Sequence, residues 1–171
     1  MIKPIIVATA MLAAVLPASA SAGEVFGGLY VHDVKTPLNL SGIEGGMDLQ
    51  LGWRGGRIGK TPLQPYAFGA LNTAGETSYA AAGFSARFGR SIFIRPGIGL
   101  AIHNGSADEF NRTDKIAFGS RILFEPELGI GAQLSGRTSI EASWVHMSHA
   151  TLFSGQNPGI DNLGVRLTLG L

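Results

Sequence analysis

The sequence has no cysteine among its 171 residues, so neither a disulfide framework nor thiol chemistry can operate in it. Charge is also scarce: there are 13 basic and 12 acidic residues, and no basic run or patch of the kind that binds nucleic acid. After residue 22 no apolar stretch is long enough for a membrane-spanning helix, and helical periodicity is missing. The chain must therefore be held together by a packed core or by the hydrogen-bond ladder of a β-sheet.

Residues 1–22 have the pattern of a secretory signal peptide. Lys3 gives a positively charged start, residues 5–16 form an apolar core, and the small residues at 18–22 provide a cleavage site. A membrane-spanning helix needs about 20 continuous apolar residues, and Pro17 with the Ala/Ser run after it argues against that alternative. We predict an exported protein in which residues 23–171 form one domain.

Short alternating stretches, separated by glycine-rich breaks, make up the rest of the chain. In residues 45–53, for example, Met47 and Leu49 lie on one face of a strand, and Asp48 and Gln50 on the other. Six such stretches are clear, at 45–53, 77–88, 91–102, 118–134, 137–150 and 161–171; two weaker ones, at 24–32 and 63–71, have apolar residues on both faces. Pro96 and Pro126 fall inside two of them, where we expect bulges or bends. Eight strands of this length predict an all-β fold, the eight-stranded antiparallel transmembrane β-barrel of outer membranes.

Charged residues on the polar faces support a barrel with a polar interior. The expected inward set has four charges of each sign: Asp48, Glu125, Glu127, Glu141, Arg87, Arg95, Arg121 and Arg166. A soluble sandwich or a lipocalin-like barrel would instead turn its apolar faces inward, and alternation alone does not separate the two. The export signal, an apolar face that continues to the last residue, and Trp53 and Trp144 near strand ends favour the membrane barrel.

The lengths of the connections indicate an orientation. With both termini in the periplasm, the connections at 33–43, 72–76, 103–117 and 149–160 face outward, and those at 54–62, 89–90 and 135–136 face the periplasm. Long outer loops and short periplasmic turns are typical of these barrels. The end of 137–150 and the start of 161–171 then lie at the height of the outer leaflet.

Three residues in the last two stretches can form a Ser-His-Asp site. His146 and Ser148 share one face of a strand, and a hairpin can bring Asp161 to that same apolar face. A neighbouring base activates a serine hydroxyl, and a third group orients the base. The alternative is a polar strand end at the membrane interface, but a His and an Asp on a lipid-facing surface are costly without a function or a partner. A second set in the loop at 103–117 (His103, Ser106 and Asp108) shares no strand face, so we expect it to be solvated.

Three segments also resemble a known family: FEPELGIG at 124–131, WVHMSHA at 144–150 and QNPGID at 156–161. They are similar to the outer-membrane lipid A 3-O-deacylases of the PagL type. The specific part of the resemblance runs from about Ile92 to the C-terminus, and the preceding half matches in general pattern. The resemblance implies Ser148 as nucleophile, His146 as general base and Asp161 as the orienting acid, on the outer surface of the barrel.

The chain departs from this family at two positions. The family usually has Asn after the serine, where it is thought to help form the oxyanion hole, and this chain has His149. The family acid is commonly Glu, and here it is the shorter Asp161, after a connector that is one residue longer. We expect the His149 ring, or backbone N–H groups of His149 to Thr151 including Ala150, to support the oxyanion. Asn157 matches a family position and is expected to shape the connector.

By this resemblance the reaction is hydrolysis of the ester-linked 3-hydroxyacyl chain at the 3-position of lipid A, at the bacterial outer membrane. The expected partners are lipid A or lipopolysaccharide and outer-membrane lipids, with no nucleic acid, and a homodimer is left open. No cofactor or metal is expected, because the carboxylates are scattered over strands. Two alternatives stay open: another outer-membrane esterase or phospholipase with the same triad, or a non-catalytic small barrel.

Overall fold

The structure, a computed structural model, describes residues 23–37, 39, 42–108, 115–153, 155 and 157–171. The predicted signal peptide at 1–22 lies outside these residues. The strands are β1 (Glu24–Val31), β2 (Met47–Arg54), β3 (Leu63–Asn72), β4 (Tyr79–Ala86), β5 (Phe88–Gly89), β6 (Ile92–His103), β7 (Ile122–Gln133), β8 (Thr138–Met147) and β9 (Ile160–Gly170). The described part of the chain contains no apolar helix of membrane-spanning length.

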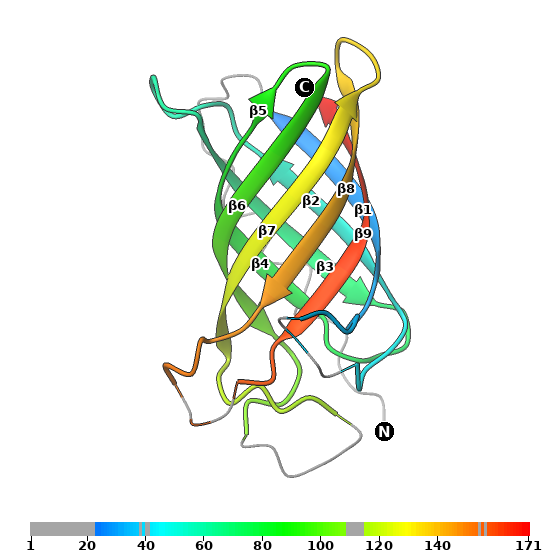
Figure 1. Ribbon diagram of the computed structural model, residues 1–171, viewed down its shortest axis with the longest axis vertical. Helices are drawn as coiled ribbons and strands as arrows, with labels where there is room; N and C mark the ends of the chain where they lie inside the picture. The colour runs from blue at the N-terminus through cyan, green and yellow to red at the C-terminus, as the bar shows by residue number, and fades with distance from the viewer. Residues whose placement is uncertain (1–22, 38, 40–41, 109–114, 154, 156) are drawn as a thin grey trace.

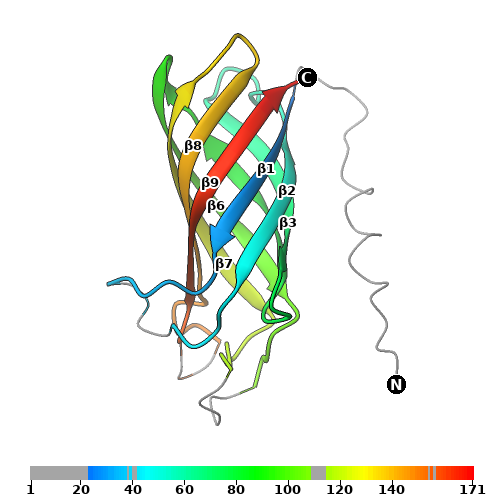
Figure 2. The ribbon, with the colours of Figure 1, turned by 90° about the vertical axis from the view of Figure 1, so that its right-hand side faces the viewer.

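All strand pairs are antiparallel and form one closed sheet (Figures 1 and 2). The sheet runs β4-β3-β2-β1-β9-β8-β7-β6, and pairing of β4 with β6 closes it. The first and last strands also pair: every residue of β1 has a partner in β9. β5 continues β4 against the same partner, β6. Counted together, they make the barrel eight-stranded. The prediction of an eight-stranded antiparallel barrel is confirmed.

β4 and β5 act as one barrel strand that is interrupted opposite Pro96. The pairing Ser85↔Gly97 on one side of the gap and Phe88↔Ile94 on the other keep the same register. A bulge would add a residue and shift the register, so this interruption is not a bulge. Proline has no N–H to donate to the ladder, and the pairing skips it.

The interior of the barrel is polar and charged, and its outer surface is apolar. Arg54, Arg95 and Arg166 are almost fully buried. Their carboxylate partners, at 2.8–3.5 Å, are Glu24, Glu127 and Glu141. Large apolar side chains such as Leu51, Ile98 and Leu167 are more than half exposed on the outside. This distribution excludes the soluble sandwich and the lipocalin-like alternative, because both need an apolar interior.

The predicted set of inward charges was wrong at Arg121 and missed Arg54. Arg121 lies before β7 and donates to the backbone carbonyls of His103 and Gly105. Arg87 does face inward: it is half-buried at the opposite mouth of the barrel, where its guanidinium lies 3.8 Å from the centre of the buried Phe93 ring and donates to the Gln133 side chain. Arg54, assigned to a connection, is the last residue of β2 and points into the lumen. Charges near strand ends escape an alternation argument, because the point where a strand ends decides which way they point.

Aromatic side chains explain why the sequence could not orient β1 and β3. Phe26, Tyr66, Phe68 and Tyr79 are all buried within the barrel, with Phe68 at 5.9–6.2 Å from each of the other three rings. Aromatic residues therefore fill part of the lumen, beside the ion pairs. An apolar residue in these two strands does not mark the outer face.

The two ends of the barrel differ (Figure 1). The C-terminus and the connections at 55–62, 90–91 and 134–137 lie at one end, the top in this view, and the connections at 32–46, 73–78, 104–121 and 148–159, three of which are longer, lie at the other. β8 ends and β9 begins at the end with the longer loops. The three predicted site residues therefore lie at that end.

Candidate active site

His146 and Asp161 face each other across the β8–β9 hairpin. They are direct partners in the register of the two strands, and His146 Nδ1 lies 2.7 Å from Asp161 Oδ1. The other ring nitrogen, Nε2, lies 3.0 Å from Ser148 Oγ. The structure thus brings the three predicted side chains together in one hydrogen-bonded chain.

Ser148 is fixed by the neighbouring strand, although it lies just beyond the end of β8. Its N–H donates to Phe124 O at 3.1 Å, and its carbonyl accepts from Phe124 N at 2.7 Å. In this register Pro126 stands opposite His146 and has no N–H to donate. As at Pro96, the register does not shift, so the ladder opens at the histidine without a bulge and closes again at the serine.

Asp161 is fully buried, even though it has the outward parity of β9. Its Oδ1 accepts from Trp144 Nε1 at 2.9 Å as well as from His146. Its Oδ2 accepts from the hydroxyl of Thr36, in the loop after β1. Three donors and the absence of water contact keep the carboxylate in one orientation.

Trp144 also packs beside the base. Its ring lies 5.8 Å from the ring of His146, with an angle of 27° between the planes, and His146 is only 9% exposed. The indole therefore contacts the imidazole and holds the acid through Nε1–H. The sequence placed Trp144 on the apolar face with His146, but it gave no sign of this hydrogen bond.

The residues after Ser148 form a strained turn. Leu152 N donates to His149 O at 2.9 Å, and the two central residues, Ala150 and Thr151, have φ angles of 52° and 59°. Positive φ at both central positions is the mark of a type I′ turn, which normally uses Gly, Asn or Asp. Such strain in alanine and threonine is often stored at functional sites.

Contacts of His149 with Asn157 and Phe153 fix the position of this turn. The His149 N–H donates to Asn157 Oδ1 at 3.0 Å, and its fully buried ring packs 6.0 Å from that of Phe153. The His149 amide is therefore engaged within the protein. Through this bond Asn157 connects the loop before β9 to the residue that follows Ser148.

Gly159 closes the site from the β9 side. Its φ is +63°, and a Cβ added to it would lie 3.3 Å from His146 Cε1. A larger residue would be strained in this backbone conformation and would crowd the imidazole. The glycine stood in the QNPGID segment, but only the structure shows its contact with the base.

The second set of candidate residues does not form a site. His103 Nε2 contacts the backbone carbonyl of Ser120 at 2.7 Å, and Ser106 pairs with Asp108 in the exposed loop. Within the described ranges, no group of three or more His, Cys, Asp or Glu side chains could hold a metal ion.

The hydrogen-bond geometry defines what the site can do. An ionised Asp161 only accepts hydrogen bonds, so His146 Nδ1 carries the proton and Nε2 is free to accept from Ser148. In this tautomer the histidine can remove the serine proton, and the resulting imidazolium rests against the carboxylate. The arrangement suits attack on an ester by the serine hydroxyl.

Comparisons with known proteins agree with this architecture. The family model for lipid A 3-O-deacylase (PagL) matches residues 39–169. The solved structure of the outer membrane enzyme PagL is similar at 23% identity and a TM-score of 0.62, over 86% of this chain and 99% of that one.

Two further barrels share the fold. A de novo designed transmembrane β-barrel has 8% identity and a TM-score of 0.57, over 91% of this chain and all of that one. The Yersinia pestis outer membrane protein Ail has 10% identity and a TM-score of 0.52, over 88% and 99%. A search of curated proteins gives no match. Since the family model covers most of its length, this chain belongs to the PagL family of lipid A 3-O-deacylases.

Proposed function

We propose that this protein is a lipid A 3-O-deacylase of the outer membrane that uses Ser148 as its nucleophile. The observation that carries the proposal is the chain Asp161–His146–Ser148, which opens on the outward side of the last hairpin in a family of lipid A deacylases. The acyl chains of lipid A already lie in the bilayer around the barrel. A site on the outer surface meets its ester without drawing the lipid into the lumen.

The first half-reaction makes an acyl-enzyme. Ser148 Oγ attacks the carbonyl carbon of the 3-O-linked ester while its proton passes to His146 Nε2. Asp161 stabilises the imidazolium at Nδ1. When the tetrahedral intermediate collapses, the bond between the acyl carbon and the sugar oxygen breaks. The sugar oxygen leaves with the proton from Nε2. Water then attacks the acyl-serine by the same route and releases a 3-hydroxy fatty acid.

Backbone N–H groups of the strained turn supply the oxyanion donors in this mechanism. His149 N–H is already bonded to Asn157, and the His149 ring is buried against Phe153. Ala150 is the next residue, and its N–H donates no hydrogen bond within the part of the chain that the structure describes. We assign the Ala150 amide as the main donor, with the turn geometry fixed by His149 and Asn157.

Mass spectrometry of lipid A from cells that make the wild-type chain tests the proposal. The expected product has lost one 3-hydroxyacyl group, and Ser148→Ala leaves lipid A intact. Ser143→Ala is the matched control, since Ser143 lies on β8, five residues before Ser148, and is buried inside the barrel, and it should behave as wild type. Fatty acid released from phospholipid instead would favour the phospholipase alternative. Intact lipids with all three folded proteins would favour a non-catalytic barrel.

A further inference from the structure

Asp161 depends on a residue from outside the hairpin. Two of its side-chain donors, His146 and Trp144, come from β8. The third, Thr36, is 125 positions away in sequence and bonds the other carboxylate oxygen. Thr36 also lies before residue 39, where the family match begins.

A kink after β1 brings Thr36 to the acid. The chain leaves the barrel at Val31, and Asp33 takes a φ of 51°, which is unusual for a residue other than glycine. Asp33 N then donates to the Asn162 side chain at 3.0 Å, and Val34 N to the carbonyl of Asp161 at 2.7 Å. The segment that carries Thr36 therefore runs along the start of β9.

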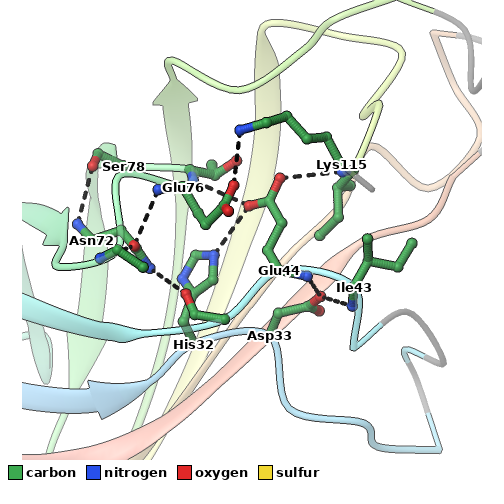
Figure 3. Close-up of polar contacts among 12 residues, drawn as sticks. His32, Asp33, Ile43, Glu44, Asn72, Glu76, Ser78 and Lys115 are labelled. Carbon is green, nitrogen blue, oxygen red and sulfur yellow. Dashed lines mark hydrogen bonds and ion pairs between the residues drawn. The ribbon is translucent and has the colours of Figure 1, made fainter. Parts of the chain in front are cut away.

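The loop that carries Thr36 is braced by buried carboxylates (Figure 3). The Asp33 carboxylate accepts the N–H groups of Ile43 at 2.6 Å and Glu44 at 2.9 Å. Glu44 in turn accepts the N–H groups of Thr77 and Ile116, both at 3.1 Å, in the two neighbouring loops. Asp33 and Glu44 are 4% and 6% exposed. Three loops thus share one network, and it fixes the position of the segment beside Asp161.

We propose, on the basis of the function given above, that Thr36 is a positioning residue for the deacylation reaction. Its hydroxyl holds Asp161 Oδ2, so that Oδ1 stays in line with His146 Nδ1–H. Without this bond the carboxylate can rotate about its χ2 torsion, and the imidazole loses its fixed partner. Thr36 acts through Asp161 and touches neither the nucleophile nor the base, so it affects the chemical step rather than lipid binding.

Steady-state kinetics on purified, folded barrels with lipid A in mixed micelles test this role. Thr36→Val keeps the shape and removes the hydroxyl, and we expect kcat to fall by roughly tenfold with KM unchanged. Thr36→Ser keeps the donor and should stay within about threefold of wild type. If Thr36→Val does not fold, Thr36→Ala takes its place. An unchanged kcat, or a loss that Thr36→Ser shares, would overturn the proposal.

A double-mutant cycle separates positioning from a structural role, because Thr36 Oγ1 also accepts the N–H of Asn39 within the loop. If Thr36 acts through Asp161, removing its hydroxyl in an Asp161→Ala background costs no further activity. A tenfold loss in both backgrounds would mean that Thr36 only folds the loop, and would refute the proposal. Activity that survives Ser148→Ala would instead refute the proposed function, so the two failures are distinguishable.

Discussion

Two clusters of buried polar side chains in this barrel differ in where their hydrogen bonds lead. In the lumen Arg166 is bonded to Glu127, Glu141 and Gln50 at once, and Arg54 and Arg95 bond the same two glutamates. Each of the three guanidinium groups bonds acceptors inside the barrel, although Arg95 Nη2 and Gln50 Nε2 have no hydrogen-bond partner among the described residues. At the site, Asp161 accepts three side-chain hydrogen bonds, but the chain continues through His146 to Ser148, which is only partly buried.

The difference separates a structural cluster from a reactive one. A network whose charges pair with one another inside the lumen presents none of them to a substrate on the outer surface. A row of hydrogen bonds with one buried end and one accessible end works differently. The carboxylate makes the histidine a better base, and the histidine activates the accessible hydroxyl. The direction of the hydrogen bonds, toward a partly exposed hydroxyl at the site and toward one another in the lumen, is the informative feature. The four predictions below test this contrast.

The largest effect is expected at the fixed end of the site. Asp161→Asn keeps the shape but cannot stabilise an imidazolium, and should lower kcat by about 10³–10⁴-fold. The measurement is single-turnover deacylation by folded protein. Glu76→Gln, in an exposed loop pair with Lys115, is the control and should match wild type. A change confined to KM would mean that Asp161 serves binding and not the chemical step.

In the lumen the same kind of loss should affect stability and leave the chemistry intact. Arg166→Met leaves Glu127 and Glu141 with fewer partners, and should lower the free energy of unfolding by about 3–5 kcal/mol. Urea unfolding in detergent measures it, with Arg137→Met at the exposed rim as a near-neutral control. The folded fraction should deacylate at the wild-type rate. A large loss of specific activity would contradict the separation of the two clusters.

The loop network lies between these extremes and should respond to pH. Burial would lower the pKa of His32, but hydrogen bonds to Asp48 and Glu44 outweigh this effect and raise the pKa to about 9. Its stabilisation is therefore complete below about pH 6.5 and is lost as pH rises to about 9, on the order of 3 kcal/mol in all.

An NMR titration of the His32 ring checks this value. The expected midpoint is near pH 9, and a His32→Gln variant identifies the resonance. A midpoint near 6.5 would show that the ring is not held as a cation between the two carboxylates.

The smallest effect is expected at the turn. Asn157→Ala releases the His149 N–H, and the turn then holds the proposed Ala150 donor less firmly, so kcat should fall by roughly tenfold. Deacylation rates of folded protein measure it. Asn72→Ala, the same change at the end of β3, where the side chain accepts backbone N–H groups of the next loop, should leave the rate within about twofold of wild type. Equal losses in both variants would mean that general loosening of the loops is responsible.

Strand alternation was enough to predict the barrel and the contents of the last hairpin. His146, Ser148 and Asp161 share a face because side chains alternate along strands, and the pairing of β8 with β9 then places His146 opposite Asp161.

Features set by loops and strand ends could not be predicted in this way. Thr36 reaches Asp161 only because Asp33 kinks the chain and the buried carboxylates brace its loop, and no local pattern encodes such a path. Arg54 was missed for a related reason, since the sequence did not show that β2 continues to it. Trp144 had the right parity, but a hydrogen bond across a hairpin depends on ring orientation, which alternation does not fix.

The pairing of β1 with β9 has a consequence for the time at which the enzyme becomes competent. These are the first and last strands of the chain, so they pair only when the barrel closes. The surroundings of Asp161 come from both sides of this seam, since Trp144 and His146 lie on the β8 side and Val34 and Thr36 follow β1. Until β1 and β9 pair, Asp161 can have only the contacts that β8 supplies. Closure of the barrel and completion of the hydrogen bonds to Asp161 are thus a single event.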